Sequence, residues 1–453
     1  MKATTQPQAP SPEFAAPDTP SAAAKSLQRR AHDLIPGGAH TYAKGDDQYP
    51  VTAPPLLERG AGSHVWDTDG REFIEYGSGL RAVTLGHGYP AVVEAAAREM
   101  ARGLNFVRPS PLEARCAEAL LEWVPGAEMV KFAKNGSDVT TAAVKLARAY
   151  TDRDLVAICL DQPFFSTDDW FIGTTPMSAG IPDAIRDLTV GFHFNDLDSV
   201  DELFARFPGR IACCVLEAAT ATEPAPGFLE GLRERCTRHG ALLVLDEMIT
   251  GLRWPGGSAQ VHYKIRPDLA TFGKALANGF PLSALVGHRD VMDLGGLHHA
   301  RKRVFLLSTT HGAESASLAA GLATMQVYRS EPVLDTLHER GEQLRAGVQQ
   351  AAQRHGVADF VDAVGRASNL IYVTRERDGK PSQVFRTLFM QELIRHGVIG
   401  PSFVVNYSHS AEDIERTVAA VDAALAVYAR ALAEGPDRFL VGRPVKPVMR
   451  GTN

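Results

Sequence analysis

Short apolar runs that alternate with segments of helical periodicity constrain the fold of this chain more than any other feature. Two neighbouring parallel strands need a long crossover between them, usually a helix, and such crossovers are right-handed. The alternation after Pro90 therefore predicts an α/β fold with a mostly parallel sheet. The expected strands are 129–133, 155–160, 211–216, 241–245 and 282–286, and the expected helices are 91–102, 111–122, 138–150, 198–206 and 227–238.

The length of 453 residues exceeds the roughly 250–300 residues at which a single core stops growing, so we expect at least two lobes. The large domain should span 81–330, and the smaller domain should combine 26–80 with 331–453. A Pro- and Ala-rich tail at 1–25 is expected to be disordered. The smaller domain should contain a β-hairpin over 65–76, a short helix over 26–34, a strand at 368–373 and helices at 382–396 and 411–433. Two long helices, at 313–328 and 333–355, should lead from the large domain to this part of the chain.

Composition excludes several classes of partner. The net charge is −6, the charged fraction is 22% and no long run of one sign occurs, so the chain lacks an electrostatic footprint for nucleic acid or an anionic membrane. No stretch approaches the ~20 apolar residues of a membrane span, and the N-terminal tail lacks the apolar core of a secretory signal. The five cysteines form no CxxC pair, which favours a reducing compartment and argues against a metal site. We therefore expect a cytoplasmic protein with small-molecule partners.

One apolar run ends in a carboxylate, and a second short segment leads to a lysine. The run 241–245 is followed by Asp246, and Lys274 stands among apolar or small neighbours. The carboxyl ends of strands in open α/β sheets present ligand-contacting groups. A buried carboxylate and a lysine of depressed pKa suit pyridoxal phosphate (PLP), as the pyridinium partner and the Schiff-base amine. The alternatives are that Asp246 only caps the following turn and that Lys274 is an ordinary surface lysine.

A small polar segment between a strand and a helix is a candidate phosphate site. In Asn135-Gly136-Ser137-Asp138, the glycine lets backbone approach an anion, and the free amides of the helix start attract phosphate. The alternative is a simple helix cap, since Asn, Ser and Asp all cap well. Asp138 competes with phosphate for the helix dipole unless its carboxylate turns into its own helix.

From about residue 26 to 427 the chain resembles the class III aminotransferases, PLP enzymes of fold type I, and within them the glutamate-1-semialdehyde aminomutase-like branch. Several independent blocks in the family order make this a specific signal. The blocks are IPGG at 35–38, VWDTDGREFIEYGSG at 65–79, LGHGYPAVVEA at 85–95, KFAKNGSDVTTAAVKLARAYTDRD at 131–154, LDEMITGLR at 245–253, FGKALANGFPLSALVG at 272–287 and THGAESASLAA at 310–320.

The resemblance implies a large domain with a seven-stranded, mostly parallel sheet and a role for each matching residue. Lys274 is implied as the Schiff-base lysine and Asp246 as the pyridinium partner. Asn135, Gly136 and Ser137 are implied to bind the cofactor phosphate. A threonine of the neighbouring subunit usually completes that site, so Thr310, or alternatively Thr309, implies an obligate homodimer. Glu217 is implied to lie near the hydroxyl face of the cofactor.

Departures from the family pattern affect the substrate more than the cofactor. The aromatic-His-Gly motif, whose ring stacks on PLP, is here Phe164-Phe165-Ser166, and Phe164 is the first choice for stacking. Thr222 stands where the aminomutase has an amide near the phenolic oxygen. Lys44 stands where the aminomutase uses an arginine to bind the substrate carboxylate, and lysine cannot make the bidentate contact. Further polar candidates for the substrate pocket are Tyr42, Tyr407 and His409.

These patterns predict a ping-pong transfer of an amino group between an amino donor and a carbonyl acceptor. The nearest alternative is an intramolecular aminomutase of the glutamate-1-semialdehyde type, which uses the same groups. An inactive PLP-fold protein that serves as a binding module is less consistent with Lys274 and Asp246. A dinucleotide-dependent dehydrogenase is disfavoured because no GxGxxG follows an early strand.

Overall fold

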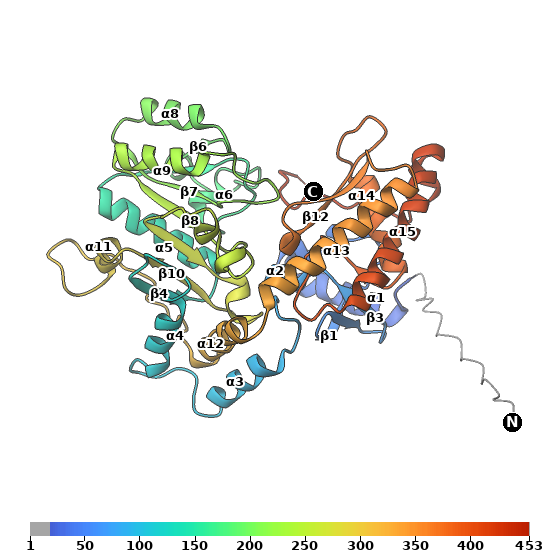
Figure 1. The fold of residues 1–453 in the computed structure, drawn as a ribbon, viewed down its shortest axis with the longest axis horizontal. Coiled ribbons are helices and arrows are strands. Elements are labelled where there is room, and N and C mark those ends of the chain that lie inside the picture. The colour runs from blue at the N-terminus through green and yellow to red at the C-terminus, as the bar shows by residue number, and fades with distance from the viewer. Residues whose placement is uncertain (1–18, 453) are drawn as a thin grey trace, which may run out of the picture.

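The computed structural model describes residues 19–452, which form two lobes joined through the short element α2 (Ser78–Arg81) (Figure 1). The larger lobe is built on a seven-stranded sheet of order β4-β10-β9-β8-β7-β5-β6. Strand β10 is antiparallel to both of its neighbours, and the other pairs are parallel. This confirms the predicted α/β fold with a mostly parallel sheet. Its strands are β4 (Met129–Ala133), β5 (Leu155–Cys159), β6 (Thr189–Phe192), β7 (Ile211–Leu216), β8 (Leu242–Asp246), β9 (Leu269–Phe272) and β10 (Ser283–Gly287).

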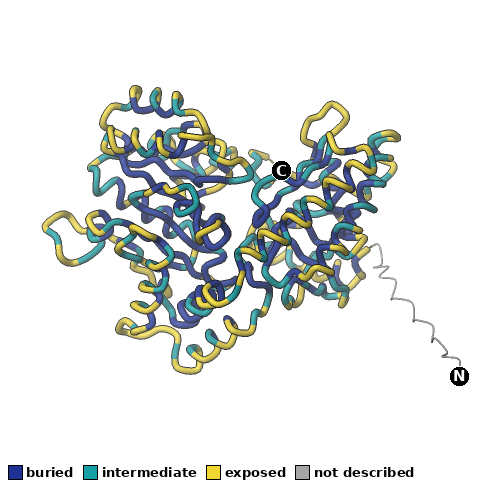
Figure 2. Tube along the Cα trace, viewed as in Figure 1, coloured by how far each residue is buried: buried dark blue, intermediate teal, exposed yellow. Residues whose placement is uncertain are grey.

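The central strands are buried along their whole length. Every residue of β5, β7, β8, β9 and β10 is buried, as the dark strands inside the larger lobe show (Figure 2). Helices cover both faces of such a sheet, which is why these strands are continuous apolar runs and not alternating ones. Two strands were not predicted: β6 lies at an edge and is only partly buried, and β9 has only four residues.

Most helices of the larger lobe agree with the predicted ones to within a few residues. The structure begins α5 at Gly136, two residues before the predicted start, and α12 at Ser315, two residues after it. The Glu314 side chain accepts from the amides of Ala316 and Ser317, which fixes the start of α12. The longer helices are α3 (Pro90–Met100), α4 (Pro111–Leu121), α5 (Gly136–Thr151), α8 (Leu197–Arg206), α9 (Phe228–His239) and α12 (Ser315–Ser330), and the short ones are α6 (Asp169–Ile172), α7 (Asp183–Arg186), α10 (Ala259–His262) and α11 (Arg289–Met292).

The smaller lobe joins the two ends of the chain in one sheet. Its four strands have the order β1-β2-β3-β13, and β13 pairs in parallel with β3 of the predicted hairpin. The predicted domain boundaries after 80 and 330 stay a prediction. The elements are α1 (Ala22–Leu34), β1 (Leu57–Ala61), β2 (His64–Asp67), β3 (Glu72–Glu75), α13 (Val333–Arg354), β11 (Val361–Val364), β12 (Ile371–Thr374), α14 (Gln383–Arg395), β13 (Val398–Ile399) and α15 (Ala411–Glu434).

Two predicted elements of this lobe begin elsewhere than expected. The predicted tail should reach residue 25, but α1 begins at Ala22 because the Ser21 side chain accepts from the Ala24 amide; residues 1–18 lie outside the described residues. The strand predicted from 368 begins at Ile371, because 367–369 form a 3₁₀ turn, η7.

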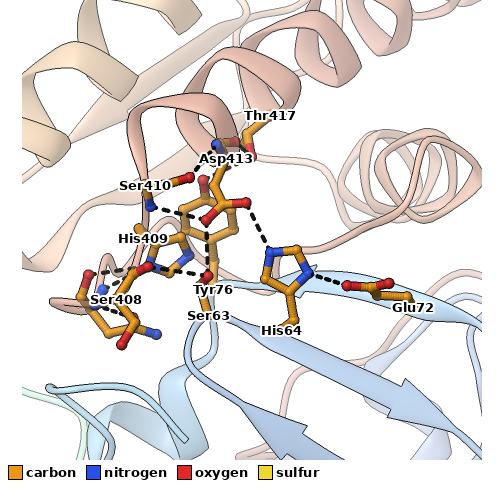
Figure 3. Close-up of polar contacts among 10 residues, drawn as sticks. Ser63, His64, Glu72, Tyr76, Ser408, His409, Ser410, Asp413 and Thr417 are labelled. Atoms are coloured by element: carbon orange, nitrogen blue, oxygen red, sulfur yellow. Dashed lines mark hydrogen bonds and ion pairs between the residues drawn. The ribbon is translucent and has the colours of Figure 1, made fainter. Parts of the chain in front are cut away.

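A partly buried polar cluster holds the hairpin against the C-terminal helix (Figure 3). Ser63 Oγ donates to Asp413 Oδ2 at 2.9 Å, and His64 Nε2 lies 2.9 Å from Asp413 Oδ1. The other ring nitrogen of His64 lies 2.6 Å from Glu72 Oε1. We call these four residues the polar clasp. It joins β2 and β3 to the first turn of α15, more than 300 residues later in the chain.

Among residues 19–452, none of the helices combines the length and apolarity that crossing a bilayer requires. The five cysteines are all buried, and each is a free thiol.

Candidate active site

Asp246 ends β8 at the carboxyl edge of the large sheet and is buried. Its Oδ1 accepts from the Met248 amide at 2.9 Å and from Thr271 Oγ1 at 3.2 Å. Both of these hydrogen bonds end on the same oxygen, so Oδ2 is available to a ligand. Burial raises the pKa of Asp246 to about 6, and a cation beside it would favour the ionised form. The capping role and the ligand role are therefore compatible, because each uses a different oxygen.

Lys274 follows β9 and begins the 3₁₀ turn η5 (Lys274–Ala277). Its φ of +44° lies in the left-handed region, which costs a non-glycine residue energy and persists where the surroundings impose it. The side chain is partly buried, and among the described residues its amine has no hydrogen-bond partner. Burial lowers the pKa of Lys274 to about 8, although the charges of Glu217 and Asp246 oppose the shift. A partly buried lysine whose pKa is lowered by burial does not fit the alternative of an ordinary surface lysine.

Glu217 follows β7 and is buried next to these two groups. The Glu217 amide donates to Gln162 Oε1 at 2.7 Å, and Gln162 Nε2 donates to the Glu217 carbonyl at 2.6 Å. Burial, with the charge of Asp246, raises the pKa of Glu217 to about 8. Gln162 is thus a positioning residue that the sequence analysis missed, and no pattern in its neighbourhood indicates this role.

The first turn of α5 is arranged as an anion site. Asp138 Oδ2 accepts from the Asn135 amide at 2.9 Å and from the Lys134 amide at 3.3 Å. The carboxylate therefore turns back into its own helix start and does not occupy the amides of Gly136 and Ser137. Neither of those two amides has a partner among the described residues. They satisfy the requirement for a phosphate group at a helix N-terminus.

Met248 brings the anion site and the lysine turn together. A Cβ on Gly136 would lie 3.0 Å from Met248 Sδ, and a Cβ on Gly273 would lie 2.6 Å from the same atom. The second distance is shorter than real Cβ contacts and the first is tighter than most of them, so glycine at both positions lets the Met248 side chain fit between the two segments. The loops after β4, β8 and β9 are thereby packed into one site.

The two adjacent phenylalanines differ in exposure. Phe165 is buried and packs edge-on against Phe171, at 5.6 Å between ring centroids. Phe164 has 42% of its surface exposed and presents a ring that a ligand can use. Thr222 lies in the exposed loop after Glu217, where its amide donates to Thr220 Oγ1 at 3.3 Å. Of the two phenylalanines, Phe164 is therefore the better candidate for stacking on a ligand ring, because more of its surface is exposed.

Thr309 and Thr310 are exposed and belong to an irregular segment before α12. The Thr310 carbonyl accepts from Asn105 Nδ2 at 2.9 Å. No hydrogen bond joins either threonine to Gly136 or Ser137 of the same chain within the described residues.

The substrate candidates fall into three places. Tyr42 and Lys44 are exposed, and Lys44 lines a cavity of about 600 Å³ together with Gly79 and Leu80 of α2. Tyr407 is partly buried, and its ring centroid lies 6.5 Å from that of Tyr89. His409 is buried beside the polar clasp and stacks on Tyr76 at 4.4 Å (Figure 3). The structure does not bring these four side chains together, and their part in substrate binding stays a prediction.

The donor set fits a phosphorylated pyridine aldehyde. The amides of Gly136 and Ser137 suit the phosphate, and the open oxygen of Asp246 suits a protonated ring nitrogen. Lys274 supplies the amine that an aldehyde requires, and Phe164 supplies an aromatic face.

A family model described as aminotransferase class-III matches residues 42–424. The chain is similar to a solved structure of the Sphingopyxis sp. MTA144 FumI protein in its PLP internal aldimine form, at 27% identity over 92% of this chain and 99% of that chain, with a TM-score of 0.84. It is similar to an omega-transaminase from Sphaerobacter thermophilus at 27% identity over 91% and 98% of the two chains, with a TM-score of 0.81. A glutamate-1-semialdehyde aminomutase from Pseudomonas aeruginosa PAO1 shares the fold at 21% identity over 90% and 94% of the chains, with a TM-score of 0.78.

Proposed function

We propose that this chain, which belongs to the class-III aminotransferase family and uses PLP, transfers an amino group from a small-molecule donor to a carbonyl acceptor by a ping-pong mechanism. The observation that carries the proposal is the position of one unengaged lysine amine beside two buried carboxyl groups, Asp246 and Glu217. The single site serves both half-reactions, since the same groups can move a proton in either direction.

Four groups of this chain hold the cofactor in the proposal. Gly136 and Ser137 bind its phosphate, Asp246 pairs with its ring nitrogen, Phe164 lies against its ring, and Lys274 joins its aldehyde carbon. When bound, PLP supplies an electron-withdrawing ring that stabilises negative charge on the substrate carbon. The carboxylate of Asp246 keeps that ring cationic, because a negative charge in a buried site favours the protonated nitrogen.

Lys274 carries the proton transfer. With the cofactor bound, the free amine of Lys274 would accept a proton at Nζ from the substrate carbon that carries the amino group and would deliver it to the former aldehyde carbon of the cofactor. A pKa lowered to about 8 keeps a larger fraction of this amine unprotonated near neutral pH than an ordinary lysine would have. Glu217, whose raised pKa leaves it largely protonated, donates a hydrogen bond on the oxygen side of the site.

A homodimer completes the site in this proposal. Thr310, or alternatively Thr309, reaches the phosphate site of the partner subunit from its exposed segment. Next to this segment lies an apolar patch formed by Met100, Leu104, Phe106 and Val107, all exposed. The Ser315 amide donates to the Leu104 carbonyl at 3.0 Å, so the patch and the threonine segment are held together. A second copy that covers this patch would bring the threonines into its own site.

We propose intermolecular transfer and not the aminomutase reaction as the activity. The exposed Lys44 lacks the planar fork with which an arginine binds a carboxylate. The chain is also more similar in sequence to the FumI protein and the omega-transaminase, each at 27% identity, than to the aminomutase, at 21%. Incubating the PLP-saturated protein with one amino donor and no acceptor distinguishes the two. Transfer releases one equivalent of carbonyl product per site, whereas a mutase isomerises its substrate without releasing one.

Covalent trapping tests the role of Lys274. Borohydride should fix PLP to the chain, and peptide mass mapping should place the modification on Lys274. Lys274→Ala should abolish the trapped adduct and slow amino transfer by at least about 10²-fold. The matched control is Lys264→Ala, since Lys264 also has a positive φ, of 55°, but is exposed. A modification on another lysine, or a Lys274→Ala protein of normal rate, would show the assignment to be wrong.

A further inference from the structure

Four successive residues of α2 adopt left-handed backbone. The φ angles of Ser78, Gly79, Leu80 and Arg81 are 45°, 57°, 59° and 70°. A left-handed non-glycine residue is energetically unfavourable, and runs of them are rare because only glycine adopts this region freely. Strain of this kind persists where surrounding contacts impose it, and it concentrates at ligand sites. Element α2 lies between the two lobes (Figure 1).

Contacts from both lobes hold this strained turn. On one side, the Ser78 amide donates to Glu75 Oε2 at 2.9 Å, and Ser78 Oγ donates to the Val404 carbonyl at 3.2 Å. On the other side, Arg253 donates through Nη2 to the Arg81 carbonyl. Arg253 is fully buried and follows Asp246 by seven residues. The turn is thus fastened to the segment that carries the buried aspartate.

Further contacts fasten the turn to the segment of Lys274. The Leu85 amide donates to Asn278 Oδ1 at 2.9 Å, and Asn278 Nδ2 donates to the Gly86 carbonyl at 2.9 Å. Asn278 directly follows η5, and α2 itself contacts η5. The strained turn therefore places Arg81 beside the lysine turn and not on an outer surface.

The guanidinium of Arg81 is oriented but not neutralised. Its Nε donates to Oδ1 of the buried Asn369 at 2.8 Å, which fixes the plane of the group. Within residues 19–452 neither Nη1 nor Nη2 has a hydrogen-bond partner, and no carboxylate lies at ion-pair distance. The charge of Arg81 nevertheless acts on the pKa values of Lys274 and Glu217, which agrees with a position next to both. The two terminal nitrogens form the edge of the fork that binds a carboxylate with two parallel hydrogen bonds.

We propose that Arg81 binds a carboxylate group of the amino donor or the carbonyl acceptor and so selects acidic substrates. This inference rests on the proposed amino transfer and names the substrate class of that site. Glu217 does not serve as the permanent partner of Arg81, because burial favours its protonated form. An arginine that keeps its charge next to a reactive lysine, without an internal anion, needs an external one.

Paired donors test the inference. L-Alanine and 4-aminobutyrate each have a counterpart in which hydrogen replaces the carboxylate, ethylamine and propylamine. The wild-type holoenzyme and Arg81→Gln should be compared by the rate of the spectral change of bound PLP. We expect kcat/KM for the two carboxylate donors to fall on the order of 10²-fold in Arg81→Gln, since a charge-assisted bidentate contact is lost. Values for the two amines should change by less than about 3-fold.

Two further variants exclude an indirect effect. Arg81→Lys keeps a charge but lacks the fork, so it should recover only part of the carboxylate preference. Arg98→Gln changes an exposed arginine of α3 and should leave both classes of donor unaffected. PLP content and the thermal midpoint of all variants should match the wild type. An equal loss for carboxylates and amines, or no loss for either, would overturn the inference.

A binding measurement keeps this inference distinct from the proposed function. Glutarate is a dicarboxylate without an amino group, and its Kd for the holoenzyme can be measured by calorimetry. If the wild type binds glutarate and Arg81→Gln binds it at least about 10-fold more weakly, Arg81 is a carboxylate site even when no donor reacts. If donors react but glutarate binding and donor preference do not depend on Arg81, amino transfer stands and the role of Arg81 is wrong.

Discussion

At the scale of single residues, the site depends on ionisable side chains that are buried close together. Burial lowers the pKa of Lys274 to about 8 and raises that of Glu217 to about 8. Each shift favours the neutral form, which is the form that a nucleophilic amine and a hydrogen-bond-donating acid require. The apolar neighbours of Lys274 already predicted its lowered pKa from the sequence. The raised pKa of Glu217 was not predicted, because it arises mainly from burial in the folded chain and from the charge of Asp246 on another strand.

The lowered pKa of Lys274 predicts how fast the cofactor-free protein captures PLP. Only the unprotonated amine attacks an aldehyde, so the rate should rise with pH up to about 8 and level off above it. A lysine with an ordinary pKa of about 10.4 would keep gaining rate well beyond that value. Stopped-flow absorbance of the cofactor-free protein mixed with PLP measures the profile, with free N-acetyllysine as the reference amine. A rate that still rises above about pH 9.5 would contradict the lowered pKa.

At the scale of elements, the smaller lobe is held by contacts between distant segments. Strand β13 adds two residues to the N-terminal hairpin sheet, and the polar clasp fastens the same hairpin to α15. The hydrogen bond that His64 donates to Asp413 is the largest cause that raises the pKa of His64. Burial opposes ionisation of Asp413, but hydrogen bonds from His64, Ser410 and Ser63 hold its pKa well below the usual range.

The polar clasp predicts a pH-dependent contribution to stability. The folded-state pKa of His64 is raised, so its contribution is fully present below the unfolded value of about 6.5 and is lost as pH rises through the folded value. His64→Ala should lower the free energy of unfolding by about 1–3 kcal/mol near pH 6 and by less above the folded-state pKa. Thermal unfolding from about pH 5.5 to 9 measures the difference from wild type.

The matched control for the clasp is His193→Ala. His193 also faces a carboxylate, Asp161, at 3.3 Å, but both side chains are about half exposed. Exposed ion pairs contribute little to stability, so the free energy of unfolding of this variant should match that of the wild type at every pH. A His64→Ala effect that grows with pH would mean that the clasp does not hold a charged histidine.

At the scale of the whole molecule, the exposed apolar patch of Met100, Leu104, Phe106 and Val107 leaves apolar surface in contact with water on a lone chain. Phe106 is 53% exposed and Val107 is fully exposed, in the segment between α3 and α4 of the larger lobe. Apolar groups that cluster on a surface mark an interaction site. Because the patch adjoins Thr310, covering it with a second copy would also bring a hydroxyl group to the partner's phosphate site.

Disrupting the patch should therefore affect both assembly and cofactor binding. Phe106→Glu with Val107→Glu should convert a dimer into monomers in sedimentation velocity and raise the Kd for PLP, because the partner's threonine is lost. Leu34→Glu, at a residue 70% exposed on α1 of the other lobe, is the control and should change neither. A doubly substituted protein that stays dimeric, or a monomer that binds PLP as well as the wild type, would disprove this arrangement.

The sequence by itself determined the α/β class, most strand and helix positions, and the candidates Asp246, Lys274 and Gly136. These follow from local rules: buried parallel strands are apolar runs, crossovers are helices, and the carboxyl ends of such strands meet at one edge. Residues placed just after a strand can therefore be assigned to a common site before any distance is known.

Only the tertiary structure decided where the side chains beyond the strand ends lie. Met248 links two glycines that are 137 residues apart (136 and 273), and Gln162 clamps Glu217 across the sheet. His409 was predicted for the substrate pocket but is buried against Tyr76, and Arg81 reaches the lysine turn through a left-handed backbone. Such placements depend on packing between segments distant in the chain, and no periodicity or local motif encodes them.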